Sequence, residues 1–264
     1  MNTRNKSALF FLGLIFLSIS SCDLGGDDLK PINNGINFTV GEYYQYSNSF
    51  PIPAIGFYTN ELFSCNNNLL YQYLETTTTS ITITLRGYRA NSSCSGSSSP
   101  ASSIVPLYQN NGTYDLNIKY KDSEDKYKLI VSDSTMVITQ DEMFTFSTPN
   151  NTKYWKYPES SFAIFAGTEY GGDTLYTQLF DSLDQKYDFT EFTFPDSGLT
   201  PYPDSLSGFE VNYATRFFKY ENIQNVYSAG SFIRDFGVNN IVDRDKNRFI
   251  LLDWTNVLFT TSDL

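Results

Sequence analysis

Segments in which apolar and polar residues alternate recur through the first half of this chain. Tyr114–Tyr120 alternates, the polar run Asp122–Lys126 follows, and Tyr127–Val131 alternates again. Alternation places every second side chain on one face of a β-strand, and two such segments around a short polar run predict a β-hairpin. Ile81–Leu85 alternates in the same way, and we expect Leu69–Leu74 to pair with it across a threonine-rich connection. The chain must therefore fold largely as β-sheet.

The strand pattern continues beyond these hairpins. Met136–Thr139 and Met143–Phe146 have strand character, and no helical period separates the strands. Aromatic residues make up 17% of the chain, and such residues favour half-buried pleated surfaces. We predict a mainly β fold in which residues 36–147 form an N-terminal immunoglobulin-like or related β-sandwich.

Residues 148–264 are predicted to form an α+β, mostly antiparallel C-terminal region. Asp173 begins the only clear helical period of the mature chain, with Leu179 and Leu183 on one face. Proline and glycine crowd residues 195–208, which we expect to form an irregular loop. Five segments have strand character: Ser161–Phe165, Phe189–Phe194, Phe209–Tyr213, Phe232–Phe236 and Phe249–Trp254. The sequence leaves open whether this half is a separate domain.

Residues 1–21 have the layout of a secretory signal peptide. Arg4 and Lys6 precede the apolar run Ala8–Ile19, which is shorter than the roughly 20 residues that span a bilayer. A positive start, a short apolar run and small residues after it are typical of a cleaved export signal. We therefore expect the mature protein to leave the cytoplasm.

The end of this signal, Ile19–Cys22, resembles the lipobox of bacterial lipoproteins. The resemblance implies cleavage before Cys22, a diacylglycerol on its thiol and a further acyl chain, such as palmitate, on the new N-terminus. Three acyl chains would anchor the protein stably in a membrane of the cell envelope, for which we expect the outer membrane. A plain signal peptide followed by an unmodified cysteine is the alternative.

Residues 22–35 are rich in Gly, Asp, Asn and Pro, a composition typical of a flexible acidic tether. This tether is similar to the surface-export signals of lipoproteins in the Bacteroidota. A solvated spacer fits the composition as well, and in other bacteria an Asp beside the lipidated cysteine, here Asp23, favours inner-membrane retention. The sequence leaves the surface and periplasmic faces of the membrane both open.

Two cysteines, Cys65 and Cys94, remain once Cys22 carries lipid. An even remainder in an exported protein favours a disulfide. The bridge would pin a serine-rich loop to the start of the predicted hairpin. Two free thiols are the alternative.

Several kinds of chemistry are excluded by composition. The chain has no histidine, which removes Ser-His and Cys-His catalysis and imidazole metal sites. Its net charge of −11 and lack of a Lys/Arg cluster argue against nucleic-acid binding. A pair of carboxylates, as in glycosidases, remains available for catalysis, but nothing in the sequence singles out a pair. We assign no catalytic residue.

One short segment resembles a metal site. Asp243, Asp245 and Asn247 place oxygen atoms at alternate positions, as Ca²⁺ loops do. Arg248, however, stands where an EF-hand loop has glycine. We expect Asn239–Leu252 to be two strands joined by a polar turn, with Ca²⁺ as the only cofactor that the sequence suggests.

Four Asp-[Ser/Thr]-[apolar or Thr] tripeptides are similar to the O-glycosylation sequon of exported Bacteroidota proteins. The acceptors would be Ser134, Thr174, Ser182 and Ser205. Ordinary turn and helix positions are the alternative interpretation.

Three segments, Glu42–Tyr46, Tyr71–Tyr73 and Tyr154–Tyr157, gather phenol rings. Such rings are ordinary half-buried strand residues, or they are exposed and stack on sugars or protein partners. We expect a non-catalytic module that binds a glycan or an envelope protein. The alternative is a carboxylate-dependent glycan-active enzyme on the same anchor. Exposed aromatic rings would favour binding, and carboxylates converging in a cleft would favour catalysis.

Overall fold

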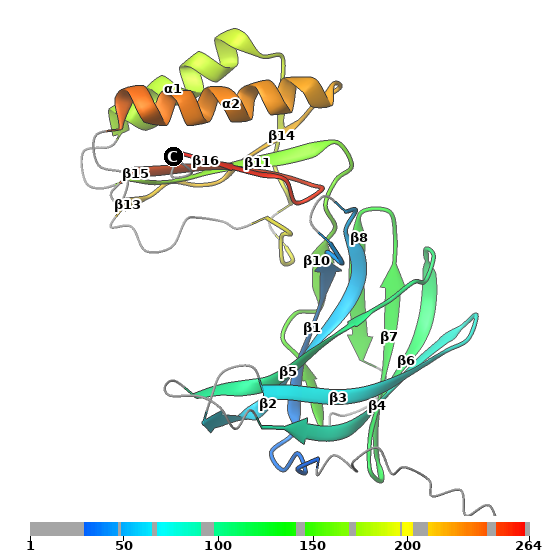
Figure 1. Ribbon diagram of the computed structural model, residues 1–264. Coiled ribbons are helices and arrows are strands. Elements are labelled where there is room, and N and C mark those ends of the chain that lie inside the picture. The colour runs from blue at the N-terminus through cyan, green and yellow to red at the C-terminus, as the bar shows by residue number, and fades with distance from the viewer. Residues whose placement is uncertain are drawn as a thin grey trace, which may run out of the picture.

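A computed structural model of the chain describes residues 29–46, 49–64, 68–90, 98–140, 146–168, 173–195, 197–202, 211–241 and 247–261. Within these ranges the strands form a ten-stranded sheet and a six-stranded sheet. Two helices of the described chain lie on the same side of the second sheet (Figure 1). The prediction of a mainly β fold, sandwich-like at the N-terminus and α+β at the C-terminus, is confirmed.

The first sheet contains all strands up to residue 155. They are β1 (Ile36–Tyr43), β2 (Ile52–Ser64), β3 (Asn68–Thr76), β4 (Ser80–Arg89), β5 (Ser98–Pro106), β6 (Gly112–Tyr120), β7 (Ser123–Val131), β8 (Thr135–Gln140), β9 (Ser147–Pro149) and β10 (Lys153–Trp155). Their order is β10-β8-β7-β6-β4-β3-β5-β2-β1-β9. The pairs β3–β5, β4–β6 and β1–β9 are parallel, and the others are antiparallel.

Both predicted hairpins form. β3 pairs with β4, which places Leu74 opposite Ile83. β6 pairs with β7 along their full length, and Lys121 turns the chain with a φ of 52°. The turn is therefore tighter than the predicted polar run. The expected strand Met136–Thr139 lies within β8, and Met143 of the next expected strand lies outside the described residues.

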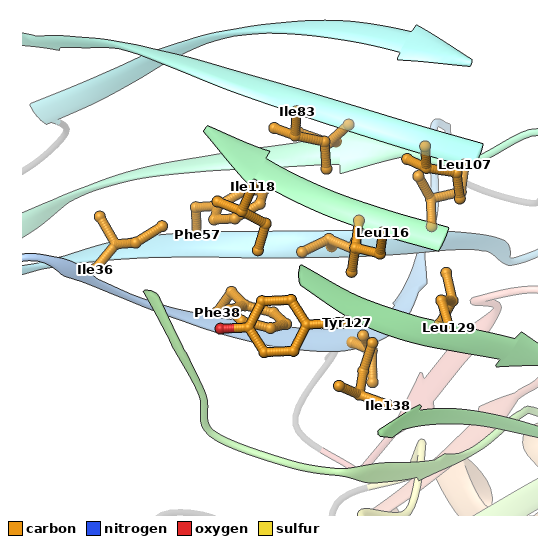
Figure 2. Close-up of a cluster of buried hydrophobic side chains, with 14 of the residues drawn as sticks. Ile36, Phe38, Phe57, Ile83, Leu107, Leu116, Ile118, Tyr127, Leu129 and Ile138 are labelled. Carbon is orange, nitrogen blue, oxygen red and sulfur yellow. The ribbon is translucent and has the colours of Figure 1, made fainter. Parts of the chain in front are cut away.

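The first sheet curls around a single hydrophobic core. Alternate residues of its strands point inward, as Figure 2 shows for Phe38, Phe57, Ile83, Leu116 and Tyr127, all of which are almost fully buried. Burying each such apolar side chain contributes roughly 1.5–3 kcal/mol, so this core is the main source of stability for the sheet.

The two ends of the curled sheet meet at the link between β9 and β10. The Asn150 backbone N–H donates to the Phe38 carbonyl at 2.7 Å, and the Ile138 N–H donates to the Thr152 carbonyl at 2.8 Å. Because β9 and β10 belong to the first sheet, the change from one sheet to the next falls after Trp155 and before Ser161. That is several residues beyond the boundary expected at residues 147 and 148.

The second sheet carries the helices. Its elements are β11 (Ser161–Thr168), α1 (Asp173–Lys186), β12 (Thr190–Phe192), β13 (Val211–Asn212), β14 (Arg216–Lys219), α2 (Ile223–Asn240), β15 (Asn247–Asp253) and β16 (Leu258–Thr260). The order is β12-β14-β11-β15-β16, β13 also pairs with β11, and all pairs are antiparallel, as predicted. The core between sheet and helices is rich in phenylalanine.

The helix predicted from Asp173 is confirmed as α1, but a second helix replaces a predicted strand. Phe232–Phe236 lies inside α2. This helix buries Val226, Ala229, Ile233 and Phe236, a helical spacing, against the second sheet. For the same reason the prediction of two strands in Asn239–Leu252 is wrong in its first half, where α2 ends, and is confirmed in its second half by β15.

Candidate binding face

Several predicted site residues lie outside the described ranges. These are Cys22, Cys65, Cys94, Ser205, Asp243 and Asp245. Asn247 opens β15. Among the residues that the structure does describe, no three His, Cys, Asp or Glu side chains gather as a metal site would require.

The three described O-glycosylation acceptors have different surroundings. Ser134 is exposed in the turn between β7 and β8, and Thr174 is exposed in the first turn of α1. Ser182 is half-buried on α1, where its hydroxyl donates to the Gln178 carbonyl at 2.7 Å. The first two hydroxyls are therefore more open to solvent than the third.

The three aromatic segments divide between two places. Tyr44, Tyr154 and Tyr157 lie where the two sheets meet, and their hydroxyl groups are largely withdrawn from solvent. By contrast, Tyr46 is 68% exposed and Tyr73 is 56% exposed. The first three rings are thus partly buried structural residues, whereas Tyr46 and Tyr73 are exposed and available to a ligand or partner.

Further exposed apolar side chains lie on the outer face of four neighbouring strands, β3, β5, β2 and β1. Residues that pair across strands share a face of the sheet. Tyr58 on β2 pairs with Ser102 on β5, and Ser102 pairs with Leu69 on β3. In the next row, Gly56 on β2 pairs with Ile104 on β5. Tyr58, Leu69 and Ile104 are all exposed, so β2, β5 and β3 present an apolar surface to solvent.

This surface carries no formal charge. We define the uncharged face as the outward alternate positions of β1 (residues 37–43), β2 (52–62), β5 (100–106) and β3 (69–73), and none of these side chains is ionisable to a charged form near pH 7. The other half of the same sheet is different: Asp115 and Lys128 form an ion pair there, as do Lys119 and Glu124. Among the described residues these two ion pairs lie on the other half, and the exposed carboxylate of Glu75, two residues after Tyr73 on β3, marks the end of the uncharged face.

A hollow of about 120 Å³ opens on the uncharged face. Its lining consists of Thr39, Gly41, Glu42, Tyr43, Ala54, Gly56, Tyr58 and Ile104, so one ionisable residue, Glu42, contributes to it. Gly41 pairs directly with Ala54, so adjacent strands of the sheet both lack bulk at this point. The hollow is a shallow depression with aromatic side chains at its edge.

A second feature, at the junction of the sheets, centres on Glu42. Its carboxylate accepts a hydrogen bond from the Tyr157 backbone N–H at 2.7 Å. Nearby, the Tyr44 hydroxyl donates to the Trp254 carbonyl at 2.9 Å, and the Tyr157 hydroxyl donates to the Pro201 carbonyl at 2.8 Å. These bonds connect β1 and the segment after β10 to the C-terminal region.

Burial governs the ionisation of this junction. It raises the pKa of Glu42 to about 7, against the opposing effects of the Tyr157 N–H bond and the positive charge of Lys156. Burial also raises the pKa of Tyr44 and of Tyr154 well above the ordinary range for tyrosine. Glu42 is therefore a buried carboxyl that lies among neutral tyrosine hydroxyls and is held by a backbone N–H bond.

A larger hollow of about 430 Å³ lies beside the start of α2. It is lined by Asp188, Thr190, Lys219, Tyr220, Glu221, Asn222 and Asn225. Two carboxylates and one lysine share this hollow. The Tyr220 hydroxyl donates to the Asp253 carboxylate at 3.1 Å and accepts from the Trp254 indole N–H at 2.9 Å, so this tyrosine is held in place.

Comparisons of the chain with protein-family models, with curated proteins and with solved structures gave no match. Neither α1 nor α2, the helices within the described ranges, is long and apolar enough to cross a membrane.

Proposed function

We propose that this chain is a lipid-anchored protein of the bacterial cell envelope, at the outer membrane, whose β region is a non-catalytic binding module. The uncharged face carries the proposal. Tyr58, Tyr73 and Ile104 expose apolar surface on this face, whereas the core of the sheet is formed by the side chains of its inner face. Contiguous exposed apolar surface on a soluble domain marks a contact site for a ligand or partner. The partner would be a glycan or an envelope protein.

The lipid anchor rests on the resemblance of Ile19–Cys22 to a lipobox. Growth with an alkyne analogue of palmitate should label the protein, and Cys22→Ser should abolish the label. Cys65→Ser is the matched control, because it removes a thiol outside the lipobox. Equal labelling of both variants would exclude acylation of Cys22. Protease treatment of intact and lysed cells then distinguishes the surface from the periplasmic face.

Binding through the uncharged face can be tested in the cell. A photo-crosslinking amino acid at Ile104, 48% exposed on β5, should capture an envelope component in intact cells. The same amino acid at Lys126, exposed on β7 in the charged half of the sheet, is the control and should capture little. Equal capture from both positions would show that the face has no special role.

We further propose a disulfide between Cys65 and Cys94. The proposal rests on the even number of cysteines that remain once Cys22 carries lipid, and both Cys65 and Cys94 lie outside the described residues. A peptide map without reductant should contain one linked species that reductant separates. Alkylation of both thiols in the unreduced protein would contradict the pairing. In the loop-entropy model, a bridge closing about 30 residues stabilises by roughly 3.5 kcal/mol.

O-glycosylation of the acceptor sites is a separate prediction. We expect peptides containing Ser134 and Thr174 to carry hexose in protein purified from its native envelope, because both hydroxyls are exposed. Ser182 should be unmodified, since its hydroxyl is half-buried and bonded to the Gln178 carbonyl. Intact-glycopeptide mass spectrometry measures all three. Modification of Ser182 alone would contradict the role given to exposure.

The alternative function, a carboxylate-dependent glycan-active enzyme, is favoured by the 430 Å³ hollow with Asp188 and Glu221. Release of reducing ends from polysaccharides, lost in both Asp188→Asn and Glu221→Gln, would establish it. An unchanged polysaccharide after prolonged incubation would leave the binding function as the only one.

A further inference from the structure

We infer that the uncharged face binds a neutral polysaccharide, with one sugar unit seated in the hollow beside Tyr43 and Tyr58. This inference rests on the proposed binding function and names the ligand class of that site. It is drawn from the charge, the chemistry and the shape of the face.

The lack of charged side chains at the outward positions of the face favours a neutral ligand. The chain has a net charge of −11, and 18% of its residues are charged, yet no charged side chain occupies the outward positions that define the face. The ionisable residues next to it are Glu42, which contributes to the lining of the hollow, and Glu75, which follows Tyr73 on the outer side of β3. Complementary charges steer and orient charged partners, so a face for a polyanion would carry Lys or Arg, and a face for a cationic partner would carry Asp or Glu. One positive charge lies at the edge of the face, where the Arg89 guanidinium is 5.1 Å from the centre of the Tyr71 ring.

The side chains of the face suit a sugar more than an apolar protein surface. Tyr58 and Tyr73 offer partly open rings, and a pyranose stacks its C–H face on such rings. Hydroxyl and amide groups lie beside these rings: Ser102 is on β5, between the strands of Tyr58 and Tyr73, and Asn37 and Thr39 are on β1, on the other side of β2. Sugars need this mixture, because their hydroxyl groups must find hydrogen-bond partners when water leaves.

The extent of the face indicates a polymer. The row formed by Tyr58, Ser102 and Leu69 crosses three strands, about 10 Å from end to end. Tyr73 extends the exposed rings further along β3. A single sugar would fill the hollow and leave this remaining surface uncovered, whereas a chain of several units would cover both.

The small size of Gly56 leaves room for the Tyr58 ring at the edge of the hollow. A Cβ at Gly56 would lie 3.2 Å from the Tyr58 hydroxyl oxygen, which is closer than ordinary contact. A larger residue would therefore displace that ring as well as fill the space. Gly41 and Ala54 complete the open region.

Affinity electrophoresis of the full-length protein in detergent tests the inference. Native gels are cast with a soluble β-glucan, a soluble α-glucan, a galactomannan or, as the polyanion, alginate. We expect retardation by at least one neutral polysaccharide and none by alginate. Tyr58→Ala should weaken the binding about tenfold, Tyr58→Phe should preserve it because the ring remains, and Gly56→Leu should abolish it. Tyr227→Ala is the matched control, since that ring is 41% exposed on α2, against 39% for Tyr58.

Each result decides the matter. Retardation by alginate, or retardation that survives Tyr58→Ala and Gly56→Leu, overturns the inference. So does a lack of retardation by every neutral polysaccharide. If Ile104 then still crosslinks to a discrete protein, the proposed binding function stands with a protein partner. If Ile104 crosslinks to nothing above the Lys126 control, the binding function fails as well. Circular dichroism of Tyr58→Ala and Gly56→Leu shows whether each variant is folded.

Discussion

Gly230→Ala should destabilise the protein by about 2 kcal/mol, although alanine is the better helix former by roughly 1 kcal/mol. The reason is the close approach of α2 to β16. A Cβ at Gly230 would lie 2.4–2.6 Å from three ring atoms of Phe259, a separation that atoms do not tolerate. Phe259 is half-buried against the same core, so its ring has little room to move. Urea unfolding followed by circular dichroism measures the loss.

A double variant separates this clash from a general effect of the substitution. In the Phe259→Ala background, Gly230→Ala should be neutral or stabilising, because only the helix propensity remains. Ser228→Ala is the control for propensity alone, since Ser228 is exposed two residues earlier on α2. If Gly230→Ala matched Ser228→Ala in stability, the helix and the strand could not be as close as described.

The same contact explains why α2 was not predicted. Gly230 and Gly237 are poor helix formers, and the aromatic run Phe232–Phe236 is typical of a strand. The helical signal was nevertheless present, because Val226 and Ile233, seven residues apart, are both buried. Both glycines serve tertiary contact, Gly230 with Phe259 and Gly237 with Thr261. These contacts cannot be predicted from the sequence alone, because they depend on the position of β16. By contrast, the β6–β7 hairpin needs only its local alternation, and it was predicted.

The uncharged face could not be predicted from the sequence, because its composition depends on which strands pair. β5 begins in the serine-rich stretch that the sequence predicts to be a loop, yet β5 lies in the middle of the sheet. Its strand character comes from its pairing with β2 and β3, not from propensity. Tyr71–Tyr73 was identified as a candidate aromatic segment, but its exposure depends on the register of β3. The lack of charge at alternate positions is readable in the sequence only after all four strands are known.

Glu42→Gln should change how stability depends on pH. Burial raises the pKa of Glu42 from 4.5 to about 7 in the folded protein. Below pH 4.5 the carboxyl is protonated in both states and costs nothing. As pH rises towards 7, the unfolded chain releases the proton first, so stability falls, and the full cost is reached above pH 7. A shift of this size corresponds to about 3 kcal/mol.

Glutamine keeps an oxygen that accepts the Tyr157 N–H bond but cannot ionise. The variant should therefore equal the parent protein near pH 4.5 and exceed its stability by about 3 kcal/mol at pH 8. Neighbouring tyrosines at the junction have raised pKa values and do not titrate in this range. Glu75→Gln, an exposed carboxylate near the end of β3, is the control and should follow the parent. Denaturant unfolding at pH 4.5, 6 and 8 gives the comparison. Parallel curves for parent and Glu42→Gln would mean that Glu42 ionises as an ordinary surface carboxylate, and that the junction tolerates its charge without cost.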